Sequence, residues 1–140
     1  LGGVRLEHPE LLGLAGHSDA DVLTHAVIDA LLGAAGLDDI GTHFPDTDER
    51  WRGADSLALL RGVAALLDEH GMTVEHVDAT IVMERPKAGP RKHEMRDNLA
   101  AALGVAHTHV NVKATTGEGM GFVGREEGVA AQAVATVRED

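Results

Sequence analysis

Apolar residues follow two different spacings in this chain, and segments of the two kinds alternate along its length. A spacing of three or four positions, which predicts helices, occurs at residues 19–36, 56–70 and 92–103. Short runs rich in valine, isoleucine and alanine, which predict strands, occur at residues 77–83, 109–114 and 129–137. Interleaved helices and strands predict one domain of the α/β (α+β) class with a single sheet. A chain of 140 residues has the ordinary size for one domain.

Polar and glycine residues predict where these elements begin and end. Ser18 is the expected N-cap of the first helix, and Gly36 can end it. Gly71 ends the second helix. Three other stretches are expected outside the helices: Gly2–Leu6 as a turn and the end of a strand, and residues 37–54 and 117–128 as loops.

The composition limits the core and the partners. Aromatic residues make up only 2% of the chain, so alanine, valine and leucine must fill the core. Small side chains bury little area, which favours an oligomer that buries more surface between subunits. Twelve basic against 23 acidic residues give a charge of −11, which disfavours nucleic acid and anionic membranes as partners. The absence of cysteine excludes disulfides and thiolate metal sites but leaves the compartment unconstrained. With no signal-peptide pattern and no apolar run long enough to span a bilayer, we expect a cytoplasmic protein.

Three polar residues of the first predicted helix lie on one stripe, because Asp21, His25 and Asp29 are four positions apart. A neutral imidazole flanked by carboxylates suits a divalent metal such as Zn²⁺, and a carboxylate can also orient the ring. The same spacing is more often that of a solvated helix face whose charges pair with one another. One histidine cannot make a metal site, so other ligands would have to come from elsewhere. Spacing alone leaves both interpretations open.

Three segments outside the predicted helices combine glycine or proline with groups that bind sugars or phosphates. The carboxylates of Asp38–Asp48 suit sugar hydroxyls, although an Asx-rich surface loop has the same composition. The segment Arg85–Arg91 could wrap a flat ring and offer Lys87 to phosphate, or it could simply connect a strand to a helix. The segment Lys113–Phe122 could offer hydroxyls and N–H groups to phosphate and Glu118 to a hard cation, or it could be a hairpin loop.

Taken in chain order, these segments form a combined pattern. It consists of Ala15-Gly16-His17-Ser18-Asp19-Ala20-Asp21-Val22, His25-Ala26, Asp29-Ala30-Leu31-Leu32-Gly33-Ala34, Asp39-Ile40-Gly41, Phe44-Pro45-Asp46-Thr47-Asp48, Asn111-Val112-Lys113-Ala114-Thr115-Thr116, Gly121-Phe122 and Gly124-Arg125. The pattern covers essentially the whole chain and closely resembles the signature of the 2-C-methyl-D-erythritol 2,4-cyclodiphosphate synthase family.

The resemblance implies a compact fold with one mixed sheet packed by helices, and a homotrimer whose active sites lie between subunits. It implies a phosphorus–oxygen lyase of the non-mevalonate route to isoprenoids. The substrate would be 4-diphosphocytidyl-2-C-methyl-D-erythritol 2-phosphate. Its 2-phosphate would attack the β-phosphorus of the diphosphate, and CMP would leave.

The resemblance also implies roles for individual residues. Zn²⁺, or another divalent metal, would be held by His25 and an N-terminal Asp-x-His motif, and Glu118 would hold a second cation, Mg²⁺ or Mn²⁺. The catalytic residues would be His17, Thr116 and Glu118. The substrate-binding residues would be His17, Ser18, Asp39, Gly41, Asp46, Met83, Pro86, Lys87, Ala88, Gly89, Thr115, Thr116, Phe122 and Arg125. Met83 and Pro86–Gly89 would line a cytosine pocket.

In some relatives, the residues that match Gly121, Phe122 and Arg125 face a cavity on the trimer axis and bind an isoprenoid diphosphate. We therefore expect three Arg125 side chains to gather there and to repel each other without an anion. The family's N-terminal Asp-x-His motif has no counterpart at the start of this chain, so we expect residues 1–140 to be a synthase domain without its first strand. Two alternatives stay open: a non-catalytic trimeric module that binds nucleotide or isoprenoid diphosphate, and part of a fusion with an upstream cytidylyltransferase.

Overall fold

The computed structural model describes residues 1–4, 6, 21–45, 47–48, 50 and 55–140. The helices are α1 (Val22–Ala35), α2 (Ile40–His43), α3 (Ser56–Glu69), α4 (Lys92–Leu103) and α5 (Gly121–Gly124). The strands are β1 (Met72–Val82), β2 (Val110–Thr115) and β3 (Ala130–Glu139). The three predicted helices and three predicted strands are all confirmed. The additional α2 and α5 have four residues each, too few to show a helical period.

One mixed sheet carries the strands in the order β2-β1-β3. β1 is parallel to β2 and antiparallel to β3, which confirms the predicted fold class. β1 begins at Met72, five residues before its predicted start. Thr73, Glu75 and His76 interrupt the apolar pattern of residues 72–76, but this segment pairs with residues 136–139 of β3, across a register shift between Val74 and His76. The long β3, a partner distant in sequence, therefore extends β1 beyond its apolar run.

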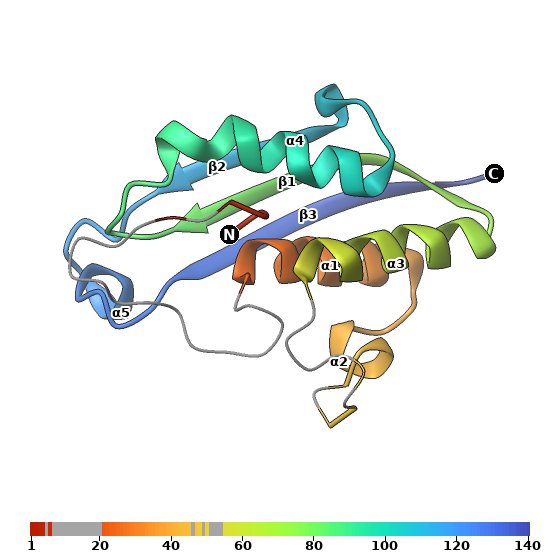
Figure 1. Cartoon of the computed structure of the whole chain (residues 1–140), viewed down its shortest axis with the longest axis horizontal. Coiled ribbons are helices and arrows are strands. Elements are labelled where there is room, and N and C mark those ends of the chain that lie inside the picture. The colour runs from red at the N-terminus through yellow and green to blue at the C-terminus, as the bar shows by residue number, and fades with distance from the viewer. Residues whose placement is uncertain (5, 7–20, 46, 49, 51–54) are drawn as a thin grey trace.

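The helices α1, α3 and α4 cover one face of the sheet, with α4 along β2 and α1 along β3 (Figure 1). Val77, Ala79 and Ile81 of β1 point to these helices and are buried, whereas the alternate residues His76 and Asp78 are not. The core is aliphatic, as the composition predicts. Its largest fully buried side chains are Leu23, Ile28, Leu31, Leu32, Leu60, Leu67, Ile81, Met95, Leu99, Val27, Val63 and Val77.

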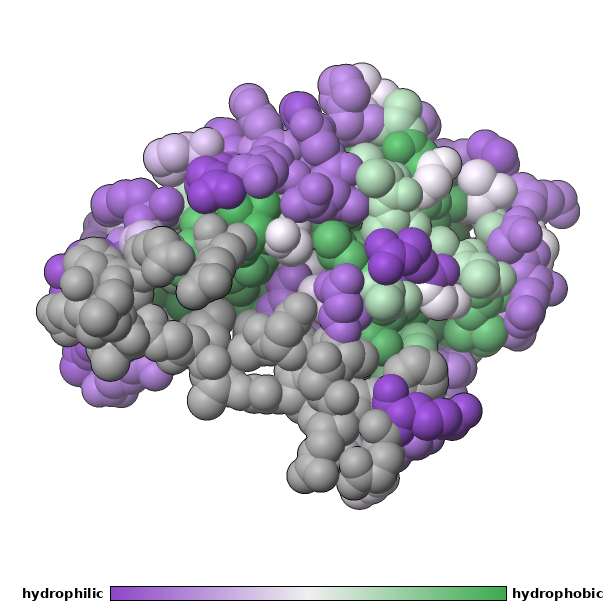
Figure 2. Space-filling view, viewed as in Figure 1, coloured by the Kyte–Doolittle hydropathy of each residue, from purple (hydrophilic) through white to green (hydrophobic). Residues whose placement is uncertain are grey.

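The outer surface of α4 is hydrophilic, whereas hydrophobic surface is visible between α4 and the helices α1 and α3 (Figure 2). Within the described residues, no helix is long and apolar enough to cross a membrane. The expected turn at the amino end is present, but residues 1–4 and 6 contain no strand. Gly2 and Gly3 have φ values of 56° and 74°, and a strand does not tolerate this left-handed backbone.

Candidate active site

The carboxyl ends of β1 and β2 lie at the same edge of the sheet, because these strands are parallel and Val82 pairs with Thr115. Two of the segments singled out in the sequence lie at this edge: Arg85–Arg91 follows β1, and Lys113–Phe122 begins in β2 and continues beyond its end. The Met83 N–H donates to the Thr115 carbonyl at 2.9 Å, which extends the pairing by one residue. Ligands of α/β sheets bind outside the carboxyl ends of parallel strands. The predicted nucleotide and phosphate segments therefore meet where a ligand is expected.

The turn after β2 has an unusual backbone. Glu118 has a φ of 52° and Gly119 a φ of 76°. The Glu118 N–H donates to Thr116 Oγ1 at 3.1 Å, and the Met120 N–H donates to the Gly117 carbonyl at 3.0 Å. Non-glycine residues with positive φ are uncommon and cluster at ligand sites. The Glu118 side chain is exposed and pairs with no described residue, so the turn presents an uncommitted carboxylate beside the Thr116 hydroxyl.

The segment after β1 offers mainly its backbone. The side chains of Met83 and Ala88 are buried against the core, and their place in a cytosine pocket stays a prediction. Pro86 follows a cis peptide bond and is half-buried, whereas Lys87 is exposed. The chain then enters a 3₁₀ turn at Gly89 that leads into α4. What this segment can present to a nucleotide is its peptide groups, one proline ring and one ammonium group.

His25 fits the predicted role of a zinc ligand. It lies near the start of α1, where its backbone N–H donates to the Asp21 carbonyl at 3.0 Å. Its Nε2 atom is buried and has no hydrogen-bond partner among the described residues. Such an orphaned buried polar atom costs about 1–3 kcal/mol, and imidazole nitrogen is a preferred donor to Zn²⁺. The described residues contain no group of three or more side chains that could hold a metal, so His25 would be one ligand among others.

Asp21 holds three segments of the chain together. Its carboxylate is 2% exposed. It accepts hydrogen bonds from Gly2 N (2.8 Å), Gly3 N (3.2 Å), Thr24 N (3.0 Å), Thr24 Oγ1 (2.7 Å) and Ser56 Oγ (2.7 Å). Burial raises the pKa of Asp21, but the hydrogen bonds from Ser56 and Thr24 outweigh it, and the pKa lies below the ordinary 3.8. The prediction of Ser18 as N-cap was wrong: Asp21 caps α1.

Asp29, the other carboxylate of the predicted stripe, also accepts a hydrogen bond from a backbone N–H. Asp29 Oδ1 accepts from Ile40 N at 2.8 Å and ties α1 to α2. Both carboxylates of the stripe accept backbone N–H groups, a role that neither interpretation of the stripe included. Asp39 caps α2, and the hydrogen bonds from the Thr42 hydroxyl and N–H lower its pKa. Gly41 lies in the same short helix.

The structure does not bring all the predicted residues together within one chain. Figure 1 shows α2, which carries Asp39 and Gly41, well apart from α5 and the strand ends. His17, Ser18 and Asp46 lie outside the described residues, so their roles stay predictions. The set therefore falls into one group at the strand edge and another on α1 and α2.

Of the three residues predicted to face the trimer axis, Gly121 and Phe122 lie in α5 and Arg125 is its C-cap. Phe122 is 49% exposed. Arg125 is also exposed, and its Nε lies 2.7 Å from Glu127 Oε1. The sequence interpretation missed Glu127, which pairs with Arg125 within the chain.

Two further residues were missed, Glu84 and Glu126, and together with Arg85 they join the two segments at the strand edge. Glu84 accepts a hydrogen bond from the Gly117 N–H, and Arg85 pairs with Glu126 at 2.7 Å. The partners are 33 and 41 residues apart in the sequence. No local pattern could have revealed contacts over such separations.

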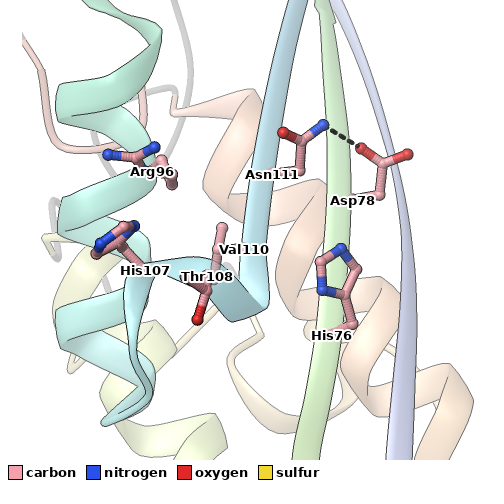
Figure 3. A pocket seen from close by; sticks show the side chains of 7 residues that line it. All are labelled: His76, Asp78, Arg96, His107, Thr108, Val110 and Asn111. Atoms are coloured by element: carbon pink, nitrogen blue, oxygen red, sulfur yellow. Dashed lines mark hydrogen bonds between the residues drawn. The ribbon is translucent and has the colours of Figure 1, made fainter.

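A cavity of about 560 Å³ lies at the other end of the strands (Figure 3). It is lined by His76, Asp78, Arg96, His107, Thr108, Val110 and Asn111. Asn111 precedes Thr115 by four residues, about 13 Å along a strand. Hydrogen bonds from Lys113 and Asn111 lower the pKa of Asp78. None of the predicted site residues lines this cavity, which is therefore separate from the candidate site.

Residues 1–138 match the model of the YgbB family. This chain belongs to the YgbB family. Over 138 residues it is 60% identical to the 2-C-methyl-D-erythritol 2,4-cyclodiphosphate synthase of Salinibacter ruber, which covers 99% of this chain and 87% of that protein. The match to this family and to such synthases confirms the family inferred from the sequence.

The family also contains larger proteins. The chain is 63% identical over 135 residues to the bifunctional enzyme IspD/IspF of Anaeromyxobacter dehalogenans, which covers 96% of this chain but only 34% of that protein. A solved 2C-methyl-D-erythritol-2,4-cyclodiphosphate synthase in a CDP-bound form matches with a TM-score of 0.80 and 35% identity, over 91% of this chain and 83% of that one. The chain therefore spans most of the length of the two single synthases and about a third of the bifunctional enzyme.

Proposed function

We propose that this member of the YgbB family cyclises 4-diphosphocytidyl-2-C-methyl-D-erythritol 2-phosphate to 2-C-methyl-D-erythritol 2,4-cyclodiphosphate and releases CMP. The observation that carries the proposal is the meeting of residues 83–89 and 115–118 at one sheet edge, joined by the Met83–Thr115 hydrogen bond. Synthases named for this product match the chain at about 60% identity, and one related structure is a CDP-bound form. Relatives of both the single and the bifunctional kind match, so the proposal concerns cyclisation alone.

The reaction makes modest chemical demands on the protein. An oxygen of the 2-phosphate forms a bond to the β-phosphorus, and the bond from that phosphorus to the oxygen of CMP breaks with its electron pair going to CMP. The nucleophile is already an anion, so no side chain has to take a proton from it. Catalysis then comes mainly from holding the two phosphates in line and offsetting their charge. Pre-organised hydrogen-bond donors on the chain can hold the phosphates in line.

Several groups at the strand edge suit this task. The Thr116 hydroxyl accepts from the Glu118 N–H and can still donate its proton to a phosphate oxygen. The exposed Thr115 hydroxyl and the Lys87 ammonium are further donors. His25 would hold Zn²⁺ and Glu118 would hold Mg²⁺ or Mn²⁺, and these cations, when bound, supply positive charge to the phosphates. Such local charge is needed because a chain of charge −11 repels a polyanion at long range.

The proposed assembly is a homotrimer in the cytoplasm, with each site between neighbouring subunits. Two features support a trimer. The predicted residues fall into two groups that one chain keeps apart, and the face of the sheet opposite the helices carries Val134, which is 72% exposed.

Sedimentation velocity tests this assembly. The parent should have three times the mass of one chain, and Val134→Asp should shift it toward the monomer. The control Ala101→Asp, on the exposed side of α4, should stay trimeric. A monomeric parent would refute this assembly.

The decisive test of function is the release of CMP and the appearance of a cyclic diphosphate in ³¹P NMR when the purified protein is given the proposed substrate. His25→Gln should lose the bound zinc, measured by metal analysis, and most of the activity, while His93→Gln on the exposed side of α4 should keep both. Glu118→Gln should require more Mn²⁺ for half-maximal activity, with Glu69→Gln as its control. Binding of CDP without any CMP release from the substrate would favour the non-catalytic module instead.

A further inference from the structure

Glu84 and Arg85 follow β1 directly and contact the two ends of the loop that carries Thr116 and Glu118. At the start of the loop, Glu84 Oε1 accepts from the Gly117 N–H. At its end, Arg85 Nε and Nη2 donate to Glu126 Oε1 and Oε2 at 2.7 and 2.8 Å. Both contacts are charge-assisted, and the second has the two-point geometry that fixes orientation as well as distance.

The loop between these contacts is closely packed on itself. A Cβ at Gly117 would lie 2.9 Å from the Met120 carbonyl oxygen, and a Cβ at Gly124 would lie 2.2 Å from the Gly119 carbonyl carbon. The Glu126 N–H donates to the Val123 carbonyl at 2.9 Å, which closes the loop after α5. This close packing at Gly117 and Gly124 links the two ends of the loop, so contacts at those ends can orient it.

We propose that Glu84 and Arg85 are positioning residues. They hold the loop 116–126 at a fixed position relative to residues 86–89, the segment proposed to bind the nucleotide. The Gly117 N–H belongs to the peptide group that joins Thr116 to Gly117. Its bond to Glu84 therefore sets the direction of the Thr116 carbonyl and of the turn into Glu118. Because Glu84 and Arg85 lead straight into Pro86, the groups that bind nucleotide and the groups that hold phosphate share one rigid support.

This inference rests on the proposed function, in which small displacements matter. Reacting groups must be held within about 0.5 Å, and a misplacement of about 1 Å can cost about 100-fold in rate. The nucleotide segment is itself anchored by the pairing of Met83 with Thr115 and by α4. Loss of the Glu84 and Arg85 contacts should therefore lower kcat far more than it weakens nucleotide binding.

The experiment compares Glu84→Gln, which keeps an acceptor oxygen at the same place, with Glu84→Leu, which removes it. Amide hydrogen exchange of residues 116–126, measured by NMR without ligand, reports the loop directly. Glu84→Leu should speed exchange of the Gly117 N–H at least tenfold and lower kcat at least tenfold, with the Kd for CMP within about threefold of the parent. Glu84→Gln should stay within threefold in all three quantities. Circular dichroism melting shows whether each variant is folded.

Arg85 gives a second, independent arm. Arg85→Glu should lower kcat and speed exchange near Glu126, and the double variant Arg85→Glu/Glu126→Arg should recover part of both, because the pair is rebuilt with reversed charges. The proposal is overturned if Glu84→Leu leaves exchange unchanged, or if Glu84→Gln is as impaired as Glu84→Leu. If the parent itself does not cyclise the substrate, the proposed function fails, yet the exchange measurements still decide whether Glu84 and Arg85 hold the loop.

Discussion

Replacing Asp21 by asparagine measures what one buried carboxylate contributes to this fold. The Asp21 carboxylate joins the turn at Gly2–Gly3, the start of α1 through Thr24, and the start of α3 through Ser56. Asparagine keeps the shape but turns one oxygen into a donor. With nitrogen in place of Oδ2, the hydroxyls of Thr24 and Ser56 can rotate and accept. The Gly3 N–H cannot reverse its role, so it loses its acceptor.

The magnitude follows from this count of partners. The Gly3 N–H is only part-buried, so the loss of its acceptor costs about 1 kcal/mol, the low end of the range for such groups. The remaining bonds lose the strength that a charged acceptor provides. We expect Asp21→Asn to lower the free energy of unfolding by about 1–2 kcal/mol. Asp21→Ala also removes the helix cap and all the other acceptor contacts, so its cost should be about 4 kcal/mol.

The pH dependence provides an independent check on the same group. The pKa of Asp21 is lower in the folded protein than its ordinary 3.8, so the unfolded chain binds more protons between the two values. Stability therefore rises with pH in that window: the contribution is complete above 3.8 and is lost as the pH falls through the folded pKa. Asp21→Asn should remove this part of the acid sensitivity.

Urea denaturation followed by circular dichroism, at pH 7 and at several values below pH 4, measures both effects. Asp68→Asn, on the exposed side of α3, makes the same chemical change without buried partners and should cost less than about 0.5 kcal/mol. The reasoning is refuted if the Asp21 and Asp68 variants have equal stability at pH 7. It is also refuted if the Asp21 variant retains the acid sensitivity of the parent.

Two glycines give further predictions of opposite sign. Gly33 is exposed within α1 and an added Cβ would meet nothing within 4 Å, so Gly33→Ala should raise the free energy of unfolding by about 0.5–1 kcal/mol, measured by urea denaturation. In Gly124→Ala the new Cβ would overlap the backbone of Gly119. This variant should therefore have a lower melting temperature and faster amide exchange in the loop 116–126. A Gly124→Ala protein that melts and exchanges like the parent would contradict the close packing of that loop.

Helix prediction succeeded where the pattern was local. α4 begins and ends at the predicted residues, and α3 ends one residue earlier than predicted. Its Leu59, Leu60, Val63 and Leu67 repeat at helical spacing and are buried, so burial and period agree. The first half of β1 escaped prediction because polar residues interrupt its apolar pattern, and the strand that it pairs with, β3, is distant in sequence. α2 and α5 escaped because a single turn carries no period.

The amino-acid sequence by itself determined the order of helices and strands, the apolar faces that form the core, and the signature that identifies the family. It did so because periodicity and short motifs are local properties. Only the tertiary structure decided which carboxylates are engaged in hydrogen bonds within the protein and which are left open to a ligand. Asp21 resembles a metal ligand but holds three segments together, Glu118 is left uncommitted, and Glu84 holds the turn that presents it. Burial and hydrogen-bond partners depend on residues that are distant along the chain, so no local pattern could reveal these roles.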